Sequence, residues 1–114
     1  MSGLLPDPAS GSELTPARVA ELLPAIARGE IDLVDCREDD EWRINRLPGA
    51  RLVPLSRFGE APLPDKPVIV YCHHGMRSLR AATHWRSRGH EPVWSMAGGI
   101  HRWSAEIDPD VPVY

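Results

Sequence analysis

The chain has 114 residues, of which 42% are hydrophobic and 25% charged, and its formal net charge at pH 7 is −3. This length and composition suit one globular domain, and the acidic balance argues against a nucleic-acid-binding protein. Two cysteines are too few for a disulfide framework, and no apolar run reaches the roughly 20 residues that span a bilayer. No secretory signal is recognisable, so we expect a reducing, cytoplasmic setting. No membrane partner is expected, and because nothing in the pattern demands an oligomer, we expect a monomer.

The N-terminal part of the chain is expected to form a flexible arm and then a helix. Residues 1–13 are rich in Pro, Gly and Ser and are expected to form the arm, with the folded domain over residues 14–114. Thr15 followed by proline is a typical helix start, and the predicted helix ends before Gly29. Pro24 lies inside it and predicts a kink or break.

Further along the chain, short apolar runs alternate with helical patterns. The elements expected are a strand over 31–36, one or two helical turns over 38–43, a strand over 51–53, a strand over 68–71, a helix over 78–88, a strand over 92–96 and a helix over 100–106. Such alternation predicts an α/β fold with a mainly parallel sheet. Ligands of these sheets bind beyond the carboxyl ends of strands, where both Cys72 and Asp35 lie.

The run from Cys72 to Ser78 is the strongest candidate for a functional site. A buried strand delivers Cys72 into a tight polar loop, and a helix is expected to begin at Ser78. Loop N–H groups and the positive end of that helix would hold the cysteine as a reactive thiolate. Gly75 permits backbone angles closed to other residues, and Arg77 would offer a permanent charge to an oxyanion. The site is therefore expected to bind a small anionic substrate.

The remaining side chains of the loop are given lesser roles. His73 and His74 are expected to act mainly through their backbone N–H groups, and Met76 to form an apolar wall at the mouth of the site. A metal site from Cys72 and the two histidines is not expected, because neighbouring loop side chains rarely converge on one ion. His101 is expected to be solvated.

Together with segments elsewhere in the chain, this loop resembles the active-site loop of the rhodanese family of sulfurtransferases. The resemblance covers about residues 15–114 and is carried by Cys72-His73-His74-Gly75-Met76-Arg77-Ser78, Leu33-Val34-Asp35-Cys36-Arg37, Glu41-Trp42, Leu47-Pro48-Gly49-Ala50, and Ala97-Gly98-Gly99-Ile100 with Trp103. The tail over residues 108–114 is similar to rhodanese domains that accompany sulfur-carrier adenylating enzymes. One departure is Asn45-Arg46, where the family usually carries Gly-His.

The resemblance implies a small α/β domain whose central, mostly parallel five-stranded sheet is flanked by helices. It also implies a thiosulfate sulfurtransferase without a metal or organic cofactor and without a nucleic-acid partner. Cys72 would take sulfur from thiosulfate or a related small anion, become a persulfide, and pass the sulfur to cyanide, a thiol or a protein. Residues 73–78 would bind the substrate. Asp35 would orient the loop or Arg37 through hydrogen bonds, although a purely structural role stays equally open.

Two other functions stay open. A low-molecular-weight thiol phosphatase of related fold uses a similar loop, but with five residues between its cysteine and arginine, whereas four separate Cys72 from Arg77. A phosphatase also needs a general acid, and none can be named. A non-catalytic interaction module of the same fold usually lacks the cysteine.

Cys36 has two possible roles. It either resolves the Cys72 persulfide as a disulfide or is a packed core thiol. By strand alternation it faces opposite to Asp35 and Arg37, so if Asp35 leans toward the cysteine loop, Cys36 leans away from it.

Overall fold

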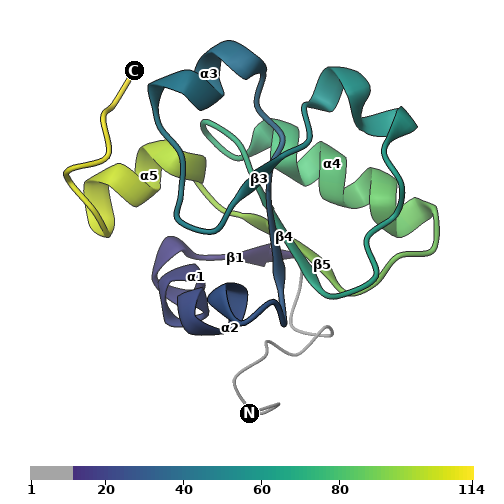
Figure 1. Cartoon of the computed structure of the whole chain (residues 1–114). Coiled ribbons are helices and arrows are strands. Elements are labelled where there is room, and N and C mark those ends of the chain that lie inside the picture. The colour runs from purple at the N-terminus through teal and green to yellow at the C-terminus, as the bar shows by residue number, and fades with distance from the viewer. Residues whose placement is uncertain (1–11) are drawn as a thin grey trace.

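The computed structural model of the chain describes residues 12–114 and has a five-stranded sheet at its centre (Figure 1). The strands are β1 (Glu13–Leu14), β2 (Asp32–Asp35), β3 (Arg51–Leu52), β4 (Val68–Tyr71) and β5 (Val93–Met96). Their order is β1-β5-β4-β2-β3, and all four pairings are parallel. This confirms the predicted α/β fold with five strands, and the sheet is wholly parallel.

The strand β1 is an element that the sequence analysis did not predict. Glu13, placed at the end of the arm, pairs with Ser95 of β5. Residues 1–11 of the predicted arm lie outside the described residues. Two residues of strand carry too little pattern to be recognised alone, and their conformation depends on pairing with β5.

Helices connect the strands and cover both faces of the sheet. They are α1 (Pro16–Glu21), α2 (Leu23–Ala27), α3 (Asp39–Ile44), the 3-10 helix η3 (Leu55–Glu60), α4 (Met76–Ser87) and α5 (Gly99–Glu106). The predicted N-terminal start is confirmed, since the Thr15 side chain accepts a hydrogen bond from the Arg18 N–H. The break predicted at Pro24 is also present, and this proline lies in the first turn of α2, where its missing N–H costs little.

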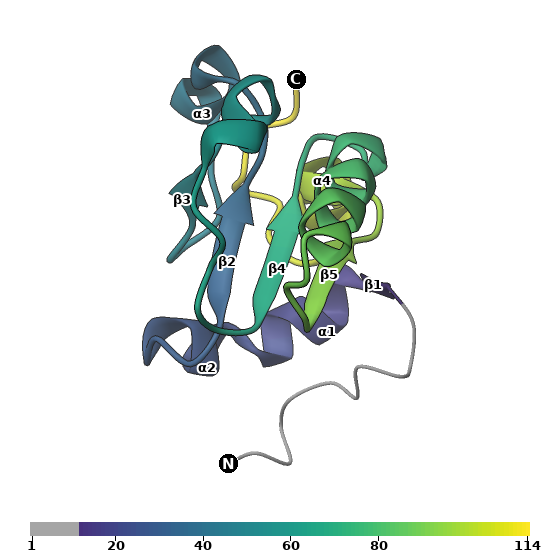
Figure 2. The same cartoon turned by 90° about the vertical axis from the view of Figure 1, so that its right-hand side faces the viewer.

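The sheet divides the interior into two cores. Helices α1, α2 and α5 pack on one face, together with Leu33, Ile69 and Tyr71 of the central strands. Helices α4 and η3 pack on the other face, against Val34 and Val70. Figure 1 shows α4 and α5 on opposite sides of the strands, and Figure 2 shows α4 on the side of the sheet that faces the viewer. Every residue of β4 is buried, as its unbroken apolar run predicts.

Between residues 12 and 114, no helix combines the length and the apolar character that a membrane span requires.

Candidate active site

Cys72 follows directly after β4, at the carboxyl end of a central strand of the sheet. The next helix, α4, begins at Met76, two residues earlier than predicted, with Gly75 as its N-terminal cap. Gly75 has a φ of +104°, and a Cβ there would lie 3.1 Å from the backbone nitrogen of Gly98. This left-handed conformation turns the chain within four residues, so that the helix N-terminus faces back toward the cysteine.

The sulfur of Cys72 lies among hydrogen-bond donors. The Gly75 N–H donates to Sγ over 3.1 Å and the Ser78 N–H over 3.3 Å. The Ser78 hydroxyl lies 3.5 Å from the same sulfur and 2.7 Å from the hydroxyl of Ser95, which positions it. A hydrogen bond from Cys36, and then those from Ser78 and Gly75, lower the pKa of Cys72 to about 5 although burial opposes ionisation. The loop therefore supplies the backbone donors that the prediction of a thiolate requires.

Cys36 lies beside Cys72, which settles the orientation that the sequence left conditional on Asp35. Asp35 pairs with Tyr71 across β2 and β4, so the two following cysteines are neighbours at the ends of adjacent strands. Both thiols are buried in the core under α4. The alternation along the chain was predicted correctly, but it is Cys36 that points to the α4 face and Asp35 that points away. The hydrogen bond to Cys72, together with burial, raises the pKa of Cys36, so the negative charge rests on Cys72.

Cys36 is a packed core thiol, as one of its two predicted roles requires, and its exposed fraction is zero. Neither cysteine forms a disulfide. The backbone N–H groups that favour the charged form reach only Cys72, which explains why the two neighbouring thiols differ.

Asp35 and Arg37 lie on the opposite face of the sheet and form a fully buried ion pair of 2.7 Å. Arg37 also donates to the Asn45 side chain over 2.7 Å and to the Asn45 carbonyl over 2.8 Å. A further hydrogen bond of 2.8 Å joins Arg37 to the Tyr114 hydroxyl. Asp35 thus orients Arg37 rather than the cysteine loop. The structure also gives Asn45 a role, because its amide nitrogen donates to the carbonyl of Pro112 and fastens the C-terminal tail.

Arg77 was expected to offer its guanidinium directly to an oxyanion, but in the structure that group binds Glu41. The two hydrogen bonds are 2.6 and 2.8 Å long. Tyr114 donates a third, of 2.7 Å, to the same carboxylate. Arg77, more than Tyr114, lowers the pKa of Glu41 to about 2. Glu41 was not predicted to contribute to the site, and its only signal in the sequence was its place in the acid-aromatic pair Glu41-Trp42.

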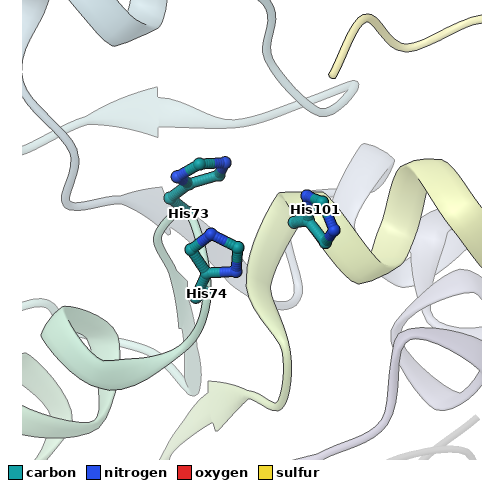
Figure 3. A group of neighbouring side chains, drawn as sticks. All are labelled: His73, His74 and His101. Atoms are coloured by element: carbon teal, nitrogen blue, oxygen red, sulfur yellow. The ribbon is translucent and has the colours of Figure 1, made fainter. Parts of the chain in front are cut away.

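Helix α5 is fastened to the cysteine loop by its own N–H groups. The Ile100 N–H donates to the Cys72 carbonyl over 2.8 Å, and the His101 N–H donates to the His73 carbonyl over 3.0 Å. Gly99 makes this approach possible, since a Cβ on it would lie 2.3 Å from the His73 oxygen. Figure 3 shows the result: His101 of α5 stands next to His73 and His74 of the loop. His101 is exposed, but it borders the site.

Met76, expected to form an apolar wall at the mouth of the site, is the first residue of α4. It is 72% exposed and contributes, with Leu79, Arg80 and Thr83, to a shallow hollow along the outer side of α4. Cys72 does not line this hollow.

The sequence of the chain matches a known protein family. Residues 18–106 match the rhodanese-like domain. The chain belongs to the rhodanese-like family. The fold agrees, since a solved human single-domain sulfurtransferase, TSTD1, is similar with a TM-score of 0.73 at 23% identity, covering 85% of this chain and 98% of that one. A Rhodopseudomonas palustris protein of unknown function, titled a possible tyrosine phosphatase, is similar with a TM-score of 0.74 at 25% identity, covering 93% and 86%.

Curated relatives of this rhodanese-like domain differ in length. A chloroplastic rhodanese-like/PpiC domain-containing protein of Arabidopsis thaliana is 38% identical over 75% of this chain and 31% of its own length. The probable adenylyltransferase/sulfurtransferase MoeZ of Mycobacterium tuberculosis is 32% identical over 93% of this chain and 28% of its own. The chain thus spans about a third of these relatives. The thiosulfate sulfurtransferase GlpE of Pseudoalteromonas translucida is 28% identical over 82% of this chain and 91% of its own.

Proposed function

We propose that this rhodanese-like domain is a sulfurtransferase that moves sulfane sulfur from thiosulfate, or a related small anionic donor, to a thiophilic acceptor through a Cys72 persulfide. One observation carries the proposal: the Cys72 sulfur accepts hydrogen bonds from the N–H groups of Gly75 and Ser78, and the pKa of Cys72 is lowered to about 5. At neutral pH it is then a thiolate, the nucleophilic form of cysteine. The similarity to GlpE, a named thiosulfate sulfurtransferase, supports the same reaction.

The reaction proceeds in two displacements at sulfur. The Cys72 thiolate attacks the outer sulfur of thiosulfate, a new S–S bond forms, and sulfite leaves with the electron pair of the broken S–S bond. An acceptor such as cyanide or a thiolate then attacks the terminal sulfur of the persulfide and regenerates the Cys72 thiolate. Covalent catalysis of this kind gives ping-pong kinetics.

The loop has features that suit this chemistry. The backbone donors that hold the thiolate would also hold the charge of a persulfide anion, because they are fixed by the turn at Gly75 and by the start of α4. Arg77 acts as a positioning residue, since its guanidinium forms a bidentate pair with Glu41 and so ties the loop to α3. A phosphatase would need that guanidinium free to hold the phosphate, which disfavours this alternative.

The test is the intact mass of the protein after mixing with thiosulfate. The wild type is expected to gain one sulfur atom and to lose it on addition of cyanide, with release of thiocyanate. Cys72→Ser is expected to gain none, because a hydroxyl cannot store sulfane sulfur. Cys36→Ser is the matched control and should still gain sulfur. A wild type that gains no sulfur but hydrolyses an aryl phosphate would contradict the proposal and favour the phosphatase.

A further inference from the structure

We propose that His73, His74 and His101 form a binding site for a divalent transition-metal ion such as Zn²⁺, at the edge of the cysteine loop. Each of the three side chains can supply one imidazole nitrogen, and these nitrogens all lie within 4.8 Å of one another (Figure 3). Imidazole is a preferred ligand of Zn²⁺, Ni²⁺ and Cu²⁺. The sequence could not indicate this site, because His101 is 27 positions beyond His74.

The spacing of the rings suits a three-histidine site. With metal–nitrogen bonds of about 2.0–2.1 Å in tetrahedral geometry, ligand nitrogens lie about 3.3 Å apart and ring centres about 5 Å apart. The ring centres here are 3.9 Å apart for His73 and His74, 4.8 Å for His74 and His101, and 5.8 Å for His73 and His101. Small side-chain rotations would bring the nitrogens together, and His74 and His101 are exposed and have room to rotate.

The backbone on which the three residues stand is held in place. The His101 N–H donates to the His73 carbonyl, so a main-chain hydrogen bond of 3.0 Å links two of the proposed ligands. The ring of His73 is further stacked on Tyr114, with ring centres 4.0 Å apart and planes within 10°. The protein thus presents one oriented imidazole and two adjustable ones, which lowers the entropic cost of closing around an ion.

His73 also has an unsatisfied nitrogen. Its Nε2 atom is buried and has no hydrogen-bond partner among the residues over 12–114. A buried polar atom without a partner is costly, so it needs an explanation. A metal ion held between the three rings supplies a partner to the His73 imidazole. The nearby charge of Arg77 does not exclude a cation, because Glu41 balances it within the same ion pair.

Three protein ligands leave a fourth tetrahedral position open. His73 directly follows Cys72 in the chain, so a bound ion would be held by the same loop that carries the reactive cysteine. We infer that the ion blocks access of the anionic donor and reversibly inhibits persulfide formation. This consequence rests on the proposed sulfur transfer, whereas metal binding itself does not.

The binding test uses the full chain, freed of metal with EDTA, and Co²⁺ as a spectroscopic probe. The wild type is expected to bind one Co²⁺ with visible d–d bands of tetrahedral geometry, and Zn²⁺ should displace it. His101→Asn is expected to weaken binding about 10-fold or more. Its backbone hydrogen bond is retained and its side chain is exposed, so the fold should be unchanged by circular dichroism. His84→Asn, an exposed histidine on α4, is the matched control and should bind Co²⁺ as the wild type does.

A second variant distinguishes this site from the thiolate. Cys72→Ser should keep the d–d bands, because the sulfur is not one of the proposed ligands. If Cys72→Ser abolished binding, or if the wild type showed an intense thiolate-to-cobalt band, the metal would belong to Cys72 and the three-histidine site would be refuted. Equal affinities of the wild type and His101→Asn would refute it as well.

The inhibition test measures sulfur gain by intact mass with and without one equivalent of Zn²⁺. The ion should slow the gain in the wild type and have little effect in His101→Asn, each variant being compared with its own metal-free rate. No gain in the metal-free wild type would refute the sulfur transfer and not the site. Binding of Zn²⁺ without slower gain would refute the inhibitory role.

Discussion

Glu41 and Arg77 are joined by two hydrogen bonds, 2.6 and 2.8 Å long, which tie α3 to the first turn of α4. The Tyr114 hydroxyl donates to the same carboxylate and accepts from Arg37, so these bonds continue into the buried Asp35–Arg37 pair. The cysteine loop on one face of the sheet is thereby linked to the polar cluster on the other.

Replacing Glu41 with Gln should lower the free energy of unfolding at neutral pH by about 1 kcal/mol, a modest value because Arg77 is one-third exposed. Arg77 holds the pKa of Glu41 down to about 2, against about 4.3 in an unfolded chain. The stabilisation is thus complete above pH ~4.3 and is lost as the pH falls toward 2. Urea unfolding of both proteins at pH 6, 4 and 3 measures this.

The control for Glu41 is Glu106→Gln, which breaks a more exposed ion pair with Arg102 on α5 and should change stability by less. A difference between the wild type and Glu41→Gln that was as large at pH 3 as at pH 6 would show that the charge of Glu41 is not responsible.

Replacing Cys36 with Ala should raise the pKa of Cys72, because a hydrogen bond from Cys36 is the largest cause of its low value. Cys36→Ser keeps a donor and should raise it less. The measurement is the rate of Cys72 alkylation by iodoacetamide against pH, with EDTA present. In the wild type the rate should be level above about pH 6 and fall through a midpoint near 5, whereas Cys36→Ala should shift the midpoint upward. Identical profiles for the wild type and Cys36→Ala would contradict the assigned contact.

Replacing Asn45 with Ala should destabilise the protein by about 1–3 kcal/mol, because a buried N–H of Arg37 loses its acceptor. It should also release the tail, since the Asn45 amide holds the Pro112 carbonyl. Thermal unfolding and hydrogen exchange over residues 108–114 report the two effects. The neighbouring Arg46→Ala is the control: its guanidinium is exposed and lies 4.2 Å above the Trp42 ring, a contact of about 0.5–1 kcal/mol. Equal losses in both variants would argue against the buried network.

Replacing Gly99 with Ala should cost about 3 kcal/mol or more, because the new Cβ would meet the carbonyl oxygens of Cys72 and His73 at 2.5 and 2.3 Å. The displaced loop should also acquire sulfur more slowly. Gly29→Ala is the matched control: its φ of +80° is also left-handed, but no atom lies within 4 Å of the added Cβ. It should cost only about 1–2 kcal/mol. Urea unfolding compares them, and similar losses would mean that backbone conformation alone, and not the close approach, sets the requirement for Gly99.

Much of the fold followed from local pattern. The apolar run over residues 68–71 predicted β4 with its observed bounds, and Thr15 with Pro24 predicted where the first helix begins and breaks. Patterns of this kind act over a few neighbouring residues, so they are legible without tertiary contacts. The predicted start of α4 was two residues too late, because Gly75 caps the helix in a left-handed conformation. Glycine can adopt this conformation but does not require it, so the sequence alone does not show that the helix begins there.

The sequence by itself determined the reactive element, since strand, cysteine, glycine and helix start are contiguous and together create the donors around Cys72. Only the tertiary structure decided which side chains share that space. It placed Cys36 beside Cys72 and directed Asp35 and Arg37 to the opposite face of the sheet. It also paired Arg77 with Glu41 and brought His101 close to His73 and His74. The physical reason is that these partners come from separate elements, and their contacts are set by strand register and by the packing of α5 on the loop.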